Sequence, residues 1–513
     1  MNFFETLLVL LLVAVLLLQV ARRLSVPYPS MLAMAGTAVA LVPGVPYIAL
    51  DPEIALALFI APALLDAAFD FPLGTARRYW VPLVVFAVGG VVVTALTVAV
   101  AGWAYAGLPF AAALVLGAVV APPDAAAATA VLSGMSIPRN TDAVLRGESL
   151  FNDAAALLIF SAALAVQTTG NIGTTVGLQF VIAAPGGILL GIATAFLFRR
   201  LGKAVAGTLG GNLLQFVQCF LLWIVAEHLH LSAVLAIVAF AMTIARSPDV
   251  RSSARMRVQS YAVWSVVVFV LNVMAFLLMG MQVRDILGTM PHGHLGDAVR
   301  FAALTVVIVI VTRFVVCIGF NRIHAIVMRR RGETDIPSTK QAILSSWCGM
   351  RGLVTLATAF ALPADFPQRD VVLLAAFAVV LATLVFQGLT LAPLIVRLGL
   401  DRRDDGPREL AALRTEIARA GYVVIKDETG PEAELIRSKF VMEKQALSDT
   451  DNKGAMRAYR ALALTAIGAQ RDRLEQLRIE NRVTVDEYNL LLEEIDWREL
   501  AILPLEERRI EEI

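Results

Sequence analysis

Two acids, an amide and a hydroxyl open one long apolar stretch of the chain, where they could bind or exchange small ions. They are Glu148, Ser149, Asn152 and Asp153, and the stretch ends near Val166. Residues four apart lie above one another on a helix, so these polar atoms would cover one broad face. Ionisable groups are expensive in hydrocarbon and indicate a functional site by default. For Glu148 a cap at the membrane surface is the alternative, whereas Asp153 lies about a turn and a half deeper.

A third acid stands beside a proline pair inside the apolar range 109–132. Pro122 and Pro123 remove two amide donors and disfavour the helix before them, which predicts a broken helix with Asp124 at the break. Carbonyls freed at membrane depth need protein or a watery cavity to receive them. Half-helix ends in mid-membrane are a common ion site in secondary transporters. The alternative is a simple proline kink in which Asp124 bonds another helix.

A positive charge interrupts the apolar range 340–362, where Arg351 stands between Gly349 and Gly352. This range is the seventh span after the proline-broken one, and an odd shift pairs helices of opposite direction. Two interrupted helices at corresponding places indicate an inverted-repeat transporter with a site near the bilayer midplane. We expect Arg351 to offset the negative half-helix ends or to pair with Glu148.

Two other charged residues also fall inside apolar ranges. Asp66 lies within 53–71 and is expected to be buried by its position. Arg313 lies within 298–319, and the sequence does not identify its partner.

Composition places the chain among polytopic helical membrane proteins. Of its 513 residues 58% are hydrophobic and 17% are charged, and the mean hydropathy is +0.74. Apolar runs of about 20 residues, the length that crosses the hydrocarbon core, recur along the chain. The net charge of +1 gives no reason to expect a nucleic-acid partner. The three cysteines and five histidines are spaced for neither a disulfide framework nor a zinc site.

Basic residues follow every second apolar run, and this alternation orients the protein in the membrane. By the positive-inside rule it predicts a multi-pass protein of the cell membrane with its N-terminus outside and its C-terminus in the cytoplasm. The thirteen predicted spans are 3–20, 29–46, 53–71, 80–103, 109–132, 148–166, 177–198, 211–229, 231–245, 259–281, 298–319, 340–362 and 370–396.

The composition changes after Leu400, which predicts a transmembrane domain over 1–400 and a cytoplasmic helical tail over 401–513. Thr484 followed by Glu487 is typical of a capping box that begins a last helix. The simplest interpretation of the tail is a small helical domain without chemistry of its own. A regulatory or self-associating tail is the alternative, and its partner is unknown.

Several of these stretches together resemble the hallmark segments of the electroneutral cation:proton antiporters of the NhaP/NHE type. The match covers most of residues 1–400. The motifs together are specific to that family, whereas any one of them alone would be a weak signal. The stretch around Asp66 is similar to that family's Pro-Pro-Leu-Leu-Phe-Glu-Ala-Ala-Phe segment. The other stretches are Pro122-Pro123-Asp124 to Thr129, Gly147-Glu148-Ser149-Leu150-Phe151-Asn152-Asp153 and Trp347-Cys348-Gly349-Met350-Arg351-Gly352.

The resemblance implies an arrangement of helices and a set of residue roles. It implies a homodimer in the lipid bilayer, with helices 1–3 and 7–10 as a scaffold and helices 4–6 and 11–13 as a core. It places the family's ion-binding aspartate at Asp153. It also implies cation or proton binding by Asn152, Asp124, Ser149 and Glu148, and structural or charge-compensating roles for Arg351, Asp66, Gly349 and Gly352.

The sequence departs from the family at two positions. Pro123 stands where many members have a threonine, so only its backbone carbonyl could serve as a ligand. Asp66 replaces the family's glutamate and is shorter by one methylene. Both departures concern the details of coordination more than the reaction.

We expect a secondary transporter, not an enzyme, that exchanges Na⁺ or Li⁺ for H⁺ and uses no cofactor. Oxygens of Asp153, Asp124 and Ser149 would bind Na⁺ together with the carbonyl of Pro123 and water. Proton and cation would compete for Asp153, and exchange is obligatory if the empty, charged site crosses the membrane poorly. The single acid of the pair Asn152-Asp153 fits electroneutral one-for-one exchange, a stoichiometry that the resemblance implies.

Other functions remain open on the sequence alone. A K⁺/H⁺ exchanger of the same fold differs only in cation preference. An intramembrane aspartyl protease could use Asp124 and Asp153 as a dyad, but it gives no reason for a broken helix with a central Arg351. A channel would pass current, whereas electroneutral exchange passes none.

Overall fold

The structure is a computed structural model, in which no strand occurs among the described residues. The chain separates into two compact units, Met1–Asp401 and Arg402–Ile513. The residues that the structure describes are 3–24, 26–42, 52–132, 135, 137–170, 174–205, 208–246, 254–289, 295–332, 337–401, 405–438, 452–480 and 482–503.

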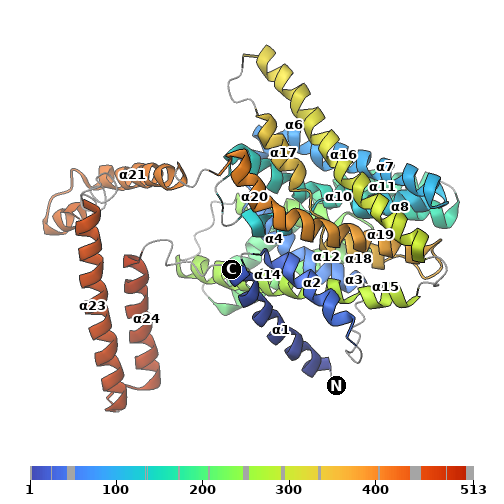
Figure 1. Ribbon diagram of the computed structural model, residues 1–513. Coiled ribbons are helices and arrows are strands. Elements are labelled where there is room, and N and C mark those ends of the chain that lie inside the picture. Colours follow the sequence, from blue (N-terminus) through green and yellow to red (C-terminus); the bar gives the residue numbers. More distant parts are fainter. Residues whose placement is uncertain are drawn as a thin grey trace. The chain divides into compact units, whose positions relative to one another are not determined.

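The first unit is built of helices, which confirms the predicted all-α membrane architecture (Figure 1). Seven helical segments among the described residues are long and apolar enough to cross a membrane. Three shorter apolar segments accompany them, Leu56–Phe69, Phe110–Val120 and Ala233–Ala245. Each predicted span contains all or part of at least one helix, and α5 and α15 lie between predicted spans; the helices of this unit follow in chain order. These are α1 (Phe3–Leu24), α2 (Tyr28–Ala40), α3 (Pro52–Ala55), η1 (Leu56–Ile60), α4 (Ala61–Phe69), α5 (Leu73–Arg78), α6 (Trp80–Val84), η2 (Val85–Gly90), α7 (Val91–Tyr105), α8 (Phe110–Val120), α9 (Ala125–Leu132), α10 (Arg139–Thr169), α11 (Thr174–Ala204), α12 (Leu209–His228), α13 (Ala233–Ala245), α14 (Ala254–Met281), α15 (Val283–Thr289), α16 (Leu295–Arg330), α17 (Thr339–Trp347), α18 (Leu353–Phe360), α19 (Arg369–Ala382), η3 (Thr383–Gln387) and α20 (Gly388–Leu398).

Two helices extend well past the predicted spans. Helix α10 begins at Arg139, ahead of the predicted start at 148, and α16 continues to Arg330, beyond the predicted end at 319. Hydropathy marks the part of a helix that lies in hydrocarbon, whereas a helix can continue into water wherever its residues favour it. The predicted boundaries are therefore wrong as helix ends at these two places.

Two spans are interrupted where the sequence predicts a break. Residues 121–124 separate α8 from α9, and residues 348–352 separate α17 from α18. The first break contains the proline pair, whose missing amides cannot continue the helical hydrogen bonds. The second contains Gly349 and Gly352. Both broken spans of the predicted inverted repeat are thus confirmed.

Close approach of backbones holds helices of this unit together, as the crossing of α2 and α14 shows. A Cβ atom at Gly36 would overlap the backbone carbonyl of Leu277, and one at Gly280 would overlap that of Ala33. Lipid tails are as apolar as leucine, so helices in a membrane associate through tight packing of small residues and not through burial from water. The glycines at this crossing are therefore needed for the contact between the helices.

The second unit contains α21 (Asp405–Ile425), α23 (Asn452–Ile479) and α24 (Val485–Ile502). Ile467 and Leu474 of α23 pack with Ile495 of α24 in a small apolar core. The predicted capping box is present, because Thr484 and Glu487 bond each other's backbone amides at the start of α24. The bond from the Thr484 amide keeps the pKa of Glu487 below its usual value. A regulatory role for residues 401–513 stays a prediction.

Candidate functional site

The two helix breaks of the first unit lie against each other. The backbone amide of Asp124 donates to the carbonyl of Met350 over 2.6 Å. In return the amide of Leu353, the first residue of α18, donates to Asp124 Oδ2 over 3.3 Å. A carboxylate at the N-terminus of a helix is stabilised by the partial positive charge there. Asp124 therefore joins both breaks through its backbone and its side chain.

The glycines of the second break make room for charged side chains. A Cβ atom at Gly352 would overlap the carboxylate of Asp124. At Gly349 it would lie 3.0 Å from Arg351 Nη1 and 3.1 Å from Arg313 Cγ. A larger residue at either position would push a charged group out of place. The predicted structural roles of these glycines have this steric basis.

Arg351 lies in the second break and is almost fully buried, with 1% of its surface exposed. Its Nε donates to the carbonyl of Val120 over 3.1 Å and its Nη2 to that of Ala121 over 3.4 Å. These carbonyls end α8, where the helix dipole is negative. Of the two partners expected for Arg351, the structure gives the half-helix end. Pairing with Glu148 is wrong.

Glu148 instead pairs with Arg313, whose partner the sequence does not identify. Arg313 Nη2 donates to Glu148 Oε2 over 2.8 Å, and Nη1 donates to Oε1. Only 5% of the Arg313 side chain and 2% of that of Glu148 are exposed. Nη2 also donates to the carbonyl of Ser345 over 3.2 Å. Both oxygens of Glu148 are thus engaged by a guanidinium, so the cation-binding role predicted for Glu148 has little support in this arrangement.

Asn152 and Asp153 of α10 are buried beside the first break. Asn152 Nδ2 donates to the carbonyl of Pro123 over 2.9 Å, while its Oδ1 is buried and has no hydrogen-bond donor among the described residues. Asp153 is 8% exposed, and its carboxylate lies within electrostatic range of Asp124. Buried polar atoms normally have partners, and an exception calls for an explanation such as a bound ion or water. The oxygens of Asn152 and Asp153 are therefore free to accept one.

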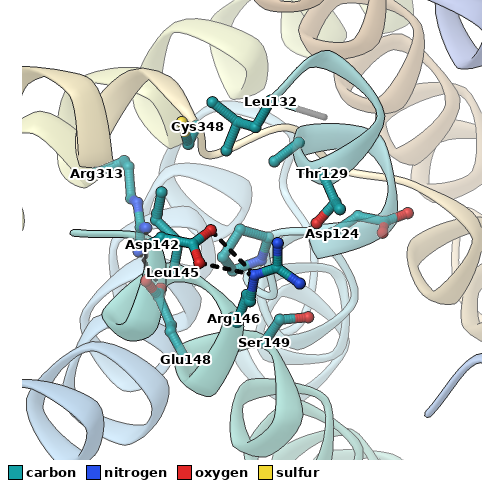
Figure 2. A pocket seen from close by; sticks show the side chains of 12 residues that line it. Asp124, Thr129, Leu132, Asp142, Leu145, Arg146, Glu148, Ser149, Arg313 and Cys348 are labelled. Carbon is teal, nitrogen blue, oxygen red and sulfur yellow. Dashed lines mark hydrogen bonds and ion pairs between the residues drawn. The ribbon is translucent and has the colours of Figure 1, made fainter. Parts of the chain in front are cut away.

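A cavity of about 350 Å³, its open mouth included, lies at the first break, and its lining includes Pro123 but not Asn152 or Asp153 (Figure 2). Asp124 and Ser149 line it, as does Thr129 of α9, whose hydroxyl the sequence analysis did not assign. Thr129 lies five residues after Asp124, on the half-helix that begins after the break, and this position could have identified it as a site residue from the sequence. The lining also includes Pro123, Ala128, Leu132, Asp142, Leu145, Arg146, Glu148, Arg313 and Cys348.

Asp66 is the predicted site residue that lies outside the two breaks and outside α10. It lies in α4, which packs against α10, and it is half-buried and not fully buried as expected. It is not among the described residues that line the cavity. Its role stays a prediction.

Comparisons with known proteins show what this chain is similar to. The family model described as sodium/hydrogen exchanger, transmembrane, matches residues 8–397. The uncharacterized Na⁺/H⁺ exchanger Rv2287 of Mycobacterium tuberculosis is 30% identical over 95% of this chain and 92% of its own length. The low-affinity Na⁺/H⁺ antiporter NhaS1 of Synechocystis is 28% identical over 75% of this chain and 72% of its own.

The fold has a counterpart among solved structures. The sodium proton antiporter MjNhaP1 of Methanocaldococcus jannaschii superimposes with a TM-score of 0.56 and 17% identity, covering 78% of this chain and 99% of that one. A further relative, from Bacillus pumilus, is named a sodium, potassium, lithium and rubidium/H⁺ antiporter and is 27% identical over 90% of this chain and 72% of its own.

Proposed function

Because this chain belongs to the sodium/hydrogen exchanger family, we propose that it exchanges Na⁺ for H⁺ at Asp153, where the two ions compete. It is a secondary transporter of a multi-pass membrane fold and not an enzyme. The transported ions are its substrates. The aspartyl protease considered for Asp124 and Asp153 has no support from this family or fold.

The balance of buried charges around the two breaks is the observation that supports this proposal. Arg313 offsets Glu148 through two hydrogen bonds, and Arg351 accompanies Asp124 at the two breaks. No described residue supplies a counter-charge to Asp153. Burial of an unpaired charge is costly, so one proton or one monovalent cation is favoured there. Because either ion brings a single positive charge, the loaded forms carry equal charge, and exchange is one-for-one and electroneutral.

The oxygens around Asp153 suit a small hard cation. Ser149 and Asp124 supply a hydroxyl and a carboxylate from the cavity wall. Asn152 supplies the buried Oδ1 that has no donor among the described residues. The carbonyl of Pro123 already accepts a bond from Asn152 and has a second lone pair. Alkali cations bind oxygen ligands of these kinds, and water entering the cavity completes the shell.

Cation gradients across proteoliposomes test the proposal. We expect an imposed Na⁺ or Li⁺ gradient to drive proton movement in the opposite direction, at a rate that clamping the membrane voltage at zero leaves unchanged. Protein-free vesicles and a choline gradient are the controls. A proton flux that only K⁺ drives would replace the proposal by K⁺/H⁺ exchange, a specificity that the name of the Bacillus pumilus relative includes. Current under voltage clamp would point to a channel.

We further propose that the C-terminus lies in the cytoplasm of the cell and the N-terminus outside. Its support is the alternation of basic loops, which includes Arg139 and Arg146 after the fifth predicted span. The cavity then opens toward the cytoplasm, because Arg146 lines it. A protease-sensitive tag after Ile513 should be cut in inverted membrane vesicles and protected in intact spheroplasts, and the reverse result would invert this orientation.

We also propose a homodimer, on the basis of the resemblance to the NhaP/NHE type. The detergent-solubilised protein should then have the mass of two chains of 55.1 kDa each. Light scattering at several protein concentrations measures it. A single-chain mass throughout, in a preparation that still exchanges cations after reconstitution, would rule the dimer out as a requirement.

A further inference from the structure

The cavity mouth carries a positive charge, although the route beyond it is proposed to admit cations. Arg146 lines the cavity together with Asp124 and Ser149 (Figure 2). Its side chain is 54% exposed, so the guanidinium is in contact with solvent at the opening. A fixed charge at the mouth of a cleft changes the local concentration of an entering ion. Without compensation, Arg146 would repel the transported cation.

An acidic side chain one turn earlier on α10 provides this compensation. Arg146 Nε lies 3.0 Å from both Oδ1 and Oδ2 of Asp142. Asp142 also lines the cavity, and its side chain is 35% exposed. Arg146 is in addition within electrostatic range of Asp70, which follows α4. The pair therefore presents almost no net charge to an ion that enters.

We propose that the ion pair Asp142–Arg146 sets the affinity for cations that enter from the cavity side. The inference rests on the proposed function, since it concerns entry to the same site. Asp142 masks the repulsion by Arg146, and Arg146 masks the attraction by Asp142. The two residues consequently have opposite effects on the same step. Exposed ion pairs contribute little to stability, so either residue can be replaced without loss of the fold.

The prediction is a pair of shifts of opposite sign in the KM for Na⁺. Arg146→Gln should lower this KM about three- to tenfold, because the carboxylate of Asp142 is left unmasked at the mouth. Asp142→Asn should raise it by a similar factor of about three to ten, because the guanidinium is left unmasked. The double variant should return to within about twofold of the wild type. Initial rates of Na⁺-driven proton flux measure the KM, with Na⁺ supplied on the cavity side.

Four controls separate this electrostatic role from a structural one. Arg139→Gln removes a positive charge at the start of the same helix from a residue that does not line the cavity, and it should leave the KM unchanged. The shifts should shrink in about 1 M choline chloride, because salt screens exposed charges. They should also be absent when Na⁺ is supplied on the opposite side. Thermal melts of all variants should match the wild type.

The outcomes distinguish this inference from the proposed function. Two single variants that shift the KM in the same direction, or that leave it unchanged while the wild type exchanges normally, overturn the role of the pair. A double variant as impaired as the worse single variant overturns it as well, because masking requires compensation. Absence of exchange in the wild type would instead refute the proposed function itself.

Discussion

Asp153→Asn is expected to reduce sodium-driven proton flux to the level of protein-free vesicles while the protein stays folded. The substitution keeps the shape of the side chain but removes its charge and its exchangeable proton. No described residue donates a hydrogen bond to the Asp153 carboxylate, so the change removes no such bond. It also removes a charge from a site that is 92% covered by protein, with 8% of the residue exposed. The melting temperature should therefore be equal to that of the wild type or higher.

Flux and thermal melting measured on the same preparation test this expectation. Asp297→Asn is the matched control, because Asp297 is an acid whose side chain is 82% exposed and which forms a surface pair with Arg300. That variant should exchange normally. Wild-type flux in Asp153→Asn would refute the assignment of Asp153. Loss of flux together with a lowered melting temperature would show that Asp153 holds the fold and would withdraw the charge-balance argument.

The second large effect concerns stability and belongs to the buried pair Glu148–Arg313. Replacing only Glu148 by glutamine, or only Arg313 by methionine, leaves the other charge buried without its partner. A change of this kind costs about 3–5 kcal/mol in other proteins. The double variant Glu148→Gln/Arg313→Met buries no charge of the pair and should recover most of the loss. Thermal melts in detergent give the order of the four proteins.

An exposed ion pair on α16, the helix that contains Arg313, supplies the control. Arg300 and Asp297 pair near the start of α16 with side chains 84% and 82% exposed, so Arg300→Gln should change the melting temperature little. Single variants of the buried pair that melt like the wild type would contradict the prediction. Transport by the double variant decides a separate question. Normal cation affinity there would show that Glu148 is not a cation ligand.

The sequence predicts best those features whose physical cause is local. Two adjacent prolines remove amide donors wherever they occur, so the break before Asp124 follows from the sequence alone. The capping box of Thr484 and Glu487 depends on residues three apart and is likewise predictable. The resemblance to the NhaP/NHE type adds the family and the candidate residues, and the comparisons confirm the family.

Features that depend on distant contacts could not be predicted in this way. Glu148 and Arg313 are 165 residues apart, and no pattern in the sequence joins them. Which of its two expected partners Arg351 bonds also depended on that pair. Because Arg313 already bonds Glu148, Arg351 bonds the end of α8. Asn152 Oδ1, which has no donor among the described residues, could not be predicted either, because its surroundings depend on where Nδ2 of the same amide bonds Pro123.

The contacts between the two breaks also have a mechanical consequence. The amide of Asp124 bonds Met350, and Arg351 bonds Val120, so each broken span supplies partners for polar groups of the other. Sliding one span past the other would strand these groups in a medium without water, at a cost of about 1–3 kcal/mol for each. The two broken spans should therefore move together as one rigid unit when the site changes from facing one side of the membrane to facing the other. The ion would move with this unit, and the two spans would not open and close around it.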